Sequence, residues 1–275
     1  FAMLGVHDDT QLIREMIERY QPDVIFNMVE QFANSLGNEN RITSFLELQG
    51  VPVTGCGSTG ITLAKDKILS KKIASFHGIK VPQFMVHAPG NIVRLNEGVQ
   101  FPLIVKPRFG STSKNISIVK NINELKKSLI NCKKPIIQEI VGKKNNEYTC
   151  GSTFINGKIL STITLKRELK NGNTKIAFHN KNINLDNFLC DVTKKLKPYG
   201  ATNFQLKLTK DGPVIFEINP RFSGTTSFRA MFGLNEIDLI LSEIYKFKIK
   251  KNKLKYGSII RYFENFYIKN TDLIK

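Results

Sequence analysis

The side chains best suited to chemistry lie close together late in the chain, and they are Gln205, Glu217, Asn219 and Arg221. The first three offer oxygen atoms, and the arginine offers a permanent positive charge. Oxygen ligands beside a cation suit a Mg²⁺ ion that holds a polyphosphate. A magnesium and phosphate site is therefore the first hypothesis, and it requires elements that bring these four side chains together.

A β-hairpin is the element expected to do this. Apolar and polar residues alternate along residues 203–209 and 213–219, which predicts two strands with one polar face each. Glu217 and Asn219 then leave the same face of the second strand, about 7 Å apart. The same alternation places Ile215 on that face.

The loop of the hairpin decides the register of the two strands. With a three-residue loop and Gly212 in the left-handed conformation, Thr209 pairs with Pro213 and Gln205 lies opposite Glu217. The alternative is an edge strand with a polar face that ends at a proline. That alternative does not explain the glutamine, the arginine and the following Ser-Gly-Thr-Thr run together.

A small hydroxyl-rich loop lies earlier in the chain, between two expected strands. Ser111, Thr112 and Ser113 follow Gly110, and Lys106 ends the strand before them. Glycine lets the chain approach a ligand closely, so main-chain N–H groups and hydroxyls could line a phosphate there. A solvent-exposed turn is the alternative, and the neighbouring lysine favours the phosphate.

The strand expected at residues 135–141 ends near a third candidate site. A strand end offers main-chain donor and acceptor groups to the edge of adenine, and Glu147 could accept the two hydroxyls of ribose. Taken alone, this pattern does not identify a nucleotide site.

The composition is that of an ordinary globular protein. The chain has 275 residues, of which 41% are hydrophobic and 23% charged, which allows one to three small domains. The net charge of +18 raises the question of nucleic acid. The lysines are widely spread and no basic stripe is interleaved with aromatic residues. We therefore interpret the charge as solvated surface that also favours an anionic substrate.

Other sequence features bear on compartment and completeness. The four scattered cysteines have no metal or redox spacing, which predicts free thiols in a reducing compartment, and zinc is not expected. No apolar run approaches the roughly 20 residues of a membrane span. Because Phe1 is not a start methionine, we expect the N-terminus to be incomplete.

The remaining pattern predicts alternating helices and strands. Strand, helix and strand within residues 23–53 predict a parallel α/β unit. In the helix at 66–77, Phe76 is expected to face inward with Ile68, Leu69 and Ile73, whereas Lys67 and Lys71 share another face. Further helices are expected at residues 10–20, 40–49, 122–131, 185–196 and 237–245. Strands are expected at 23–27, 51–53, 101–105, 116–119, 135–141, 147–154, 158–166 and 175–178.

These motifs together resemble the ATP-grasp superfamily. The segment EINPRFSG at residues 217–224, preceded by the strand that carries Gln205, is similar to the synthetase domains of carbamoyl phosphate synthase. Residues 50–55 and 63–67, with Lys71, resemble D-alanine–D-alanine ligase. The matches span residues 27–229 in the order that the superfamily requires.

The resemblance implies a fold and a domain division. We expect an α/β chain of the α+β ATP-grasp type, in which a short parallel α/β domain precedes two subdomains that clamp ATP. The expected domains are residues 1–64, which are N-terminally incomplete, 65–137 with the phosphate-lid loop, and 138–275 with the metal site.

The resemblance also implies roles for individual residues. Lys67 and Lys106 correspond to basic residues on the ATP phosphates, and Arg221 to the arginine at the reacting end. Lys166 or Arg167 corresponds to a further basic residue on phosphate, with Lys166 as the first choice. The other implied roles are the lid for Ser111, Thr112 and Ser113, the adenine hinge for Glu139, Ile140 and Val141, the ribose contact for Glu147, and the metal ligands for Gln205, Glu217 and Asn219.

The implied function is an ATP-dependent carboxylate–amine ligase that uses ATP with Mg²⁺ or Mn²⁺. A small carboxylate becomes an acyl phosphate, and an amine then displaces phosphate. The N-P-R-x-S-G continuation departs from the D-alanine ligases, so we do not assign D-alanine as substrate. Asn27 and Glu30 are candidate substrate contacts in the first domain, with simple solvation as the alternative.

Other functions remain open at this point. They are a kinase of bicarbonate or a small acid similar to carbamoyl phosphate synthase, a non-catalytic ATP-binding module, and a basic RNA-binding protein. As partners we expect small carboxylate and amine substrates, not nucleic acid or a membrane, and we keep a homodimer open. The expected location is the cytoplasm.

Overall fold

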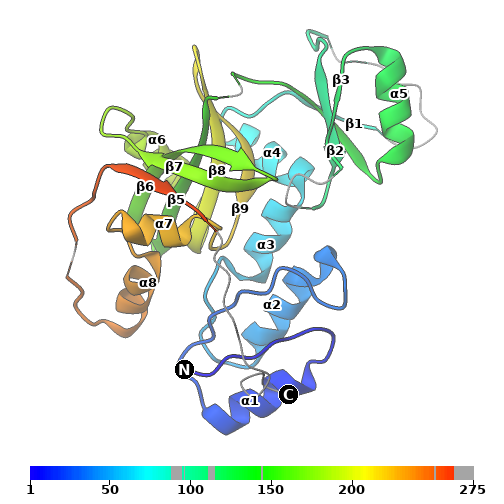
Figure 1. Cartoon of the computed structure of the whole chain (residues 1–275). Helices are drawn as coiled ribbons and strands as arrows, with labels where there is room; N and C mark the ends of the chain where they lie inside the picture. Colours follow the sequence, from blue (N-terminus) through cyan, green and yellow to red (C-terminus); the bar gives the residue numbers. More distant parts are fainter. Residues whose placement is uncertain (88–94, 96, 111–114, 144, 251, 263–275) are drawn as a thin grey trace.

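The computed structural model describes residues 1–87, 95, 97–110, 115–143, 145–250 and 252–262. The chain folds into a helical N-terminal part and two antiparallel sheets (Figure 1). The first three helices form the lower part of the view, and the two sheets lie above them on either side of α4 (Lys67–Phe76). Within the described residues, no helix is long and apolar enough to cross a membrane.

The N-terminal part has the expected parallel pairing in a reduced form. A single parallel bridge joins Ile25 to Val53 in place of two full strands. Ile13, Ile42 and Leu46 form the small core beneath that bridge. The elements are α1 (Gln11–Tyr20), a short 3-10 helix η1 (Leu36–Asn38), α2 (Glu39–Leu48) and α3 (Gly57–Lys65).

Helix α3 was not predicted, because its first residues, Gly-Ser-Thr-Gly, are poor helix formers. A side chain from another helix caps it. Glu47 of α2 accepts hydrogen bonds from the main-chain N–H of Ser58 at 2.9 Å and from its hydroxyl at 2.6 Å. A carboxylate at a helix N-terminus satisfies free N–H groups and the helix dipole. The cap is therefore tertiary and has no local sequence signal.

Helix α4 begins where expected, but its buried face differs. Asp66 caps it by accepting hydrogen bonds from the main-chain N–H groups of Ile68 and Leu69. The prediction that Phe76 faces inward is wrong, because this residue is 87% exposed, whereas Lys71 is 3% exposed. The helix crosses strand β9 (Gly212–Asn219), and that crossing turns the lysine face inward.

The smaller sheet has four antiparallel strands in the order β1-β4-β2-β3. Its core includes Leu103, Val105 and Ile137, which pack against Leu125 and Leu129 of a covering helix. The strands are β1 (Phe84–Val86), β2 (Leu103–Pro107), β3 (Ser117–Val119) and β4 (Pro135–Glu139), and the helix is α5 (Ile122–Asn131). Strand β4 ends two residues earlier than predicted, and β1 was missed.

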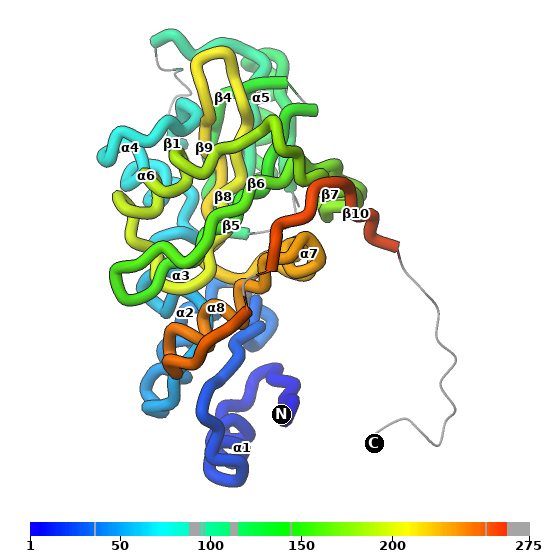
Figure 2. The backbone as a smooth tube through the Cα atoms, turned by 90° about the vertical axis from the view of Figure 1, so that its left-hand side faces the viewer, coloured from blue at the N-terminus to red at the C-terminus, as the bar shows by residue number. Residues whose placement is uncertain are grey.

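The larger sheet has six antiparallel strands in the order β10-β7-β6-β5-β8-β9. Strand β10 lies alongside β7, so the described chain returns to the sheet edge at its end (Figure 2). The strands not yet given are β5 (Glu147–Ile155), β6 (Lys158–Lys170), β7 (Asn173–His179), β8 (Gly200–Thr209) and β10 (Gly257–Ile260).

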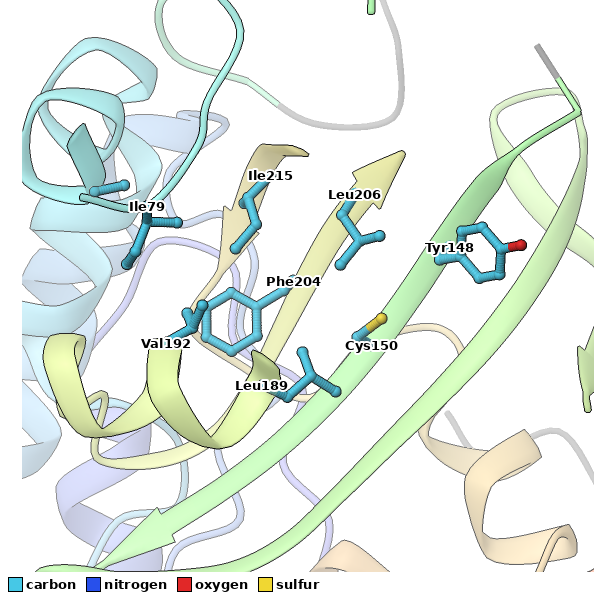
Figure 3. Packing of buried hydrophobic residues seen from close by; sticks show 9 residues of the cluster. Ile79, Tyr148, Cys150, Leu189, Val192, Phe204, Leu206 and Ile215 are labelled. Carbon is cyan, nitrogen blue, oxygen red and sulfur yellow. The ribbon is translucent and has the colours of Figure 1, made fainter. Parts of the chain in front are cut away.

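Helices cover both faces of this sheet. On one face, Leu189 and Val192 of α6 (Asp186–Leu196) pack against Phe204 and Leu206 (Figure 3). The opposite face packs beneath α7 (Thr226–Met231) and α8 (Glu236–Tyr245). Neither α7 nor β10 was predicted. The second face continues past α7 to the candidate site.

The hairpin of β8 and β9 has the predicted pairing of Gln205 with Glu217, but it reaches this pairing by another route. Thr209 pairs with Gly212, so the loop has two residues and the predicted pairing with Pro213 is wrong. A register shift at Gln205 then leaves Phe216 as an extra residue in β9. Such a β-bulge moves the following residues by one position, and this restores the predicted pairing.

The bulge also corrects the predicted faces of β9. Ile215 packs in the core with Phe204 and Leu206, so it does not share a face with Glu217 as predicted. Phe216 and Glu217 both line the same cavity on the other face. Strict alternation fails here because the bulge inserts a residue between Ile215 and Glu217.

Candidate active site

A cavity of about 220 Å³ lies where the two sheets meet. It is lined by residues from α4, from β2, from the segment between β4 and β5, and from the ends of β5, β6, β8 and β9. The predicted site residues that line it are Lys67, Lys106, Ile140, Val141, Glu147, Gln205 and Glu217.

One end of the cavity is positively charged. Lys67 donates a hydrogen bond to the main-chain carbonyl of Gly110 at 2.7 Å. Lys106 is 5% exposed, and its ammonium group has no ion-pair partner among the described residues. Burial lowers the pKa of Lys67, and burial with the nearby Lys67 charge lowers the pKa of Lys106 to about 8 despite the attraction of Glu217. Two close cations, one buried and one half-buried, indicate a site for an anion.

Glu217 is the carboxylate at this end of the cavity. It accepts a hydrogen bond on Oε1 from the side-chain amide of Asn219 at 3.2 Å. Asn219 itself lies just outside the cavity lining. Among the described residues, no group of three or more His, Cys, Asp or Glu side chains could hold a metal ion. A divalent cation would therefore find one carboxylate and amide oxygens here, which suits an ion that arrives with a phosphate ligand.

Arg167 organises the opposite wall. It donates hydrogen bonds to Oε1 of Glu147, from Nε at 2.9 Å and from Nη2 at 2.5 Å. Its Nη2 also donates to Oε1 of Gln205 at 2.8 Å. Lys207 approaches the other oxygen of Glu147 at 3.6 Å. An amide oxygen has two lone pairs. The contact with Arg167 uses one of them, so Oε1 of Gln205 keeps one lone pair for a further donor or a metal ion.

Strand alternation separates Lys166 from Arg167. Arg167 and Leu169 line the cavity, whereas Lys166 is absent from its lining and pairs with Tyr148, a core residue on the α6 face. Successive residues of a strand point to opposite faces. The structure therefore brings Arg167 to the site and does not bring Lys166 there.

The other end of the cavity is apolar. Ile140 and Val141 follow the end of β4 and line it, and within the described residues no main-chain hydrogen bond involves the N–H or C=O of Val141. A planar ring with a hydrogen-bonding edge suits this end. The other apolar side chains of the cavity include Ile104, Phe109, Ile116, Leu169 and Phe216.

Glu139 and Arg221 also lie outside the cavity, as Asn219 and Lys166 do. Glu139 points the other way, since its carboxylate accepts a hydrogen bond from the main-chain N–H of Gln83 at 2.8 Å and lines a separate open groove. Arg221 lies beyond Asn219, where its guanidinium pairs with Glu30 at 3.0 Å. Ser111, Thr112 and Ser113 lie outside the described residues.

The N-terminal part adjoins this reacting end. Phe26 stacks on Phe222 with 5.0 Å between ring centroids, so Glu30 faces Arg221 across the contact. Asn27 uses its side chain locally, donating to Thr43 at 3.1 Å and accepting from Val29 at 3.0 Å. Of the two candidate substrate contacts, only Glu30 lies near the site.

The sequence interpretation missed two contributors. Lys207 was interpreted only as an alternating strand residue, and Lys71 was placed on one helix face with Lys67 and in the family match, without a role of its own. The signal for Lys71 was present, because it lies one helical turn after Lys67 on the same face.

Residues 136–266 match the protein family described as "ATP-grasp in the biosynthetic pathway with Ter operon". The chain is similar to D-alanine–D-alanine ligase A of Bacillus cereus, with 27% identity over 203 residues, which cover 66% of this chain and 66% of that protein. Among solved structures, the ADP complex of purK, an N5-carboxyaminoimidazole ribonucleotide synthetase, matches with a TM-score of 0.74 and 15% identity over 94% of this chain and 69% of that one. The L-amino acid ligase of Bacillus licheniformis matches with a TM-score of 0.65 and 17% identity over 85% and 58%.

Residues 136–266 thus match an ATP-grasp family, and the chain shares the fold of solved ATP-grasp structures, which confirms the predicted fold class. Its curated relatives are D-alanine–D-alanine ligases at modest identity, as the sequence resemblance indicated. The chain spans 29% to 66% of the length of the first curated relatives that it matches.

Proposed function

We propose that this chain binds ATP in the cavity between the sheets and acts as an ATP-dependent carboxylate–amine ligase. The observation that carries the proposal is the pair of lysines, the buried Lys106 and the half-buried Lys67, which lie with the carboxylate of Glu217 at one end of a cavity whose far end is apolar. A polyphosphate at one end and adenine at the other match this distribution of charge.

Different residues of the cavity contact different parts of the nucleotide. Lys67 and Lys106 bind the phosphates, and Ile140 and Val141 hold adenine, with the main chain of Val141 available to its edge. Glu147 accepts the ribose hydroxyls in an orientation that Arg167 fixes. In this assignment Arg167 takes the phosphate-side role for which Lys166 was the first choice.

The metal ligands proposed are Glu217, Asn219 and Gln205. When bound, Mg²⁺ or Mn²⁺ supplies charge neutralisation between the phosphates. Lys106 offsets the charge that develops on the transferred phosphoryl group, and Arg221 binds it at the reacting end. These residues contribute by positioning and by charge, because phosphoryl transfer needs little covalent help from a protein.

The proposed reaction has two steps. A carboxylate oxygen of the first substrate attacks the γ-phosphorus, and ADP leaves. An amine nitrogen then attacks the acyl carbon, phosphate leaves with the bonding electrons, and the nitrogen loses a proton. The printed names of the relatives include D-alanine and L-amino acid ligases, which supports amino acids as the substrate class.

Three further assignments are proposals of the same kind. The chain divides into residues 1–64, 65–137 and 138–275; the two separate sheets support two units after residue 64, although β4 (Pro135–Glu139) crosses the boundary at residue 137. The cytoplasm is the proposed location, supported by four free cysteines. A homodimer is kept as a proposal.

The test is ADP release with purified protein and a panel of acids paired with amines. We expect ADP and phosphate with an amino acid pair and neither with either substrate alone. ADP release with bicarbonate alone would favour the small-acid kinase, and ATP binding without turnover would favour a non-catalytic module. Salt-sensitive binding to unrelated RNAs without ATP binding would refute the proposal.

A further inference from the structure

Helix α4 carries a buried lysine, Lys71, that the proposed nucleotide contacts leave unused. Lys71 is 3% exposed, and its Nζ donates a hydrogen bond to the main-chain carbonyl of Phe216 at 2.8 Å. Phe216 is the extra residue of the bulge in β9. A bulge leaves this residue outside the ladder, so its carbonyl needs a partner from another element.

The bulge decides which face of β9 Glu217 occupies. Ile215 packs in the core, and Glu217 lies in the cavity two residues later. In a regular strand these two side chains would share a face, because the period is two. A slip of one residue exchanges the faces of a strand. Glu217 therefore lies in the cavity only while the bulge persists.

We propose that Lys71 is a positioning residue that holds the bulge at Phe216 and so keeps Glu217 in the cavity. The importance of Glu217 rests on the proposed function, whereas the effect of Lys71 on the bulge does not. The contact joins α4 to the strand that carries the proposed metal ligands.

The surroundings of Lys71 support this role. On the same edge of β9, the main-chain N–H of Ile215 donates to the carbonyl of Lys80 at 2.9 Å, so both sides of the bulge are held by the α4 region. The N-terminus of α4 is fixed in turn, because Arg108 donates from Nε to its cap Asp66 at 2.8 Å. Burial, followed by the charge of Lys106, lowers the pKa of Lys71 well below its ordinary value. A lysine buried beside another cation requires a specific compensating contact.

Hydrogen–deuterium exchange of the ligand-free protein tests the bulge directly. Lys71→Met keeps the apolar stem and removes the donor, and Lys72→Met is the matched control on the exposed side of the same helix. We expect amides of residues 214–219 to exchange about tenfold faster in Lys71→Met, with residues 148–154 of β5 unchanged. Lys72→Met should match the wild type, and Lys71→Arg should restore slow exchange. Wild-type exchange in Lys71→Met would overturn the proposal.

Metal dependence separates positioning from direct phosphate binding. The probe is a fluorescent ATP analogue, titrated in EDTA and then with Mg²⁺. We expect the Mg²⁺ concentration that enhances binding of the analogue to be about tenfold higher in Lys71→Met than in the wild type. The affinity of the variant for the analogue in EDTA should stay within about twofold of the wild type. An equal loss in EDTA would assign Lys71 to phosphate and refute positioning.

The role of Lys71 stays testable if the variant does not fold or if the wild type does not bind the analogue. If Lys71→Met does not fold, Lys71→Gln carries the same expectations, because its shorter amide does not reach the Phe216 carbonyl. If the wild type does not bind the ATP analogue, the proposed function fails, while the exchange experiment still decides the role of Lys71.

Discussion

The charge of Lys106 should make nucleotide binding depend on pH. Its ammonium group is buried at the proposed phosphate end of the cavity, and burial is the main cause of its pKa of about 8. Three charged groups surround it: Glu217 favours the protonated form, and Lys67 and Lys71 oppose it. Only the protonated form attracts a phosphate, so affinity should fall as pH rises through this pKa.

The magnitude follows from the pKa. With a value of about 8 in the free protein, the protonated fraction falls from about 0.9 at pH 7 to about 0.1 at pH 9. A bound polyphosphate stabilises the ammonium form and raises its pKa. Affinity then follows the protonated fraction of the free protein and falls about tenfold, which equals about 1.4 kcal/mol.

The assay is calorimetric titration of ATP in EDTA at pH 7, 8 and 9. Lys106→Arg is the matched control, because a guanidinium keeps its charge across this range. We expect the ATP affinity of Lys106→Arg to lose most of its pH dependence. Any contribution from the titration of ATP itself is the same for the wild type and the variant. If the wild type and Lys106→Arg lose affinity in parallel, Lys106 is not the titrating group and the assignment of the phosphate end is wrong.

Three further changes test other parts of the site and fold. Glu217→Ala should abolish ADP release yet leave ATP binding in EDTA within a few-fold; turnover near the wild-type rate would refute its role on the metal. Arg167→Met should weaken ATP binding about tenfold in titrations, since it leaves Glu147 poorly oriented and removes a cation that contacts Gln205; unchanged affinity would return Arg167 to a structural role. Gly151→Ala should lower the melting temperature through a loss of about 1–3 kcal/mol, because the added Cβ would lie 2.5 Å from Nη1 of the buried Arg229; an unchanged melting temperature would show that the pair can move aside.

The sequence was sufficient for the elements whose signals are local. Helix α5 was predicted with both bounds correct, because Asn121 caps it and the apolar spacing is regular. The long strands β5 and β6 were also predicted, since their patterns extend over many residues. Helix α3 was missed because its cap, Glu47, comes from another helix. Local patterns do not carry contacts of this kind.

The hairpin shows why a correct pairing can rest on wrong intermediate steps. The predicted pairing of Gln205 with Glu217 assumed an extra residue in the loop, and the structure places the extra residue at Phe216 instead. Both versions place one extra residue between Thr209 and Glu217, so both give the same pairing. They differ at Ile215, and only the bulge explains why this apolar residue is buried.

The bulge and the buried lysines are two parts of one arrangement. A bulge in an edge strand exposes a carbonyl, and a lysine from the helix that crosses the strand can satisfy it. Sequence patterns treat Lys67 and Lys71 as a polar helix face, since lysines are almost never fully buried unless paired. In this fold the same face lies between the two sheets, where Lys67 binds the carbonyl of Gly110 and Lys71 that of Phe216. One helix thereby links the segment that follows β2, the strand of Lys106, to the strand that carries Glu217, and the charge of the cavity depends on both strands.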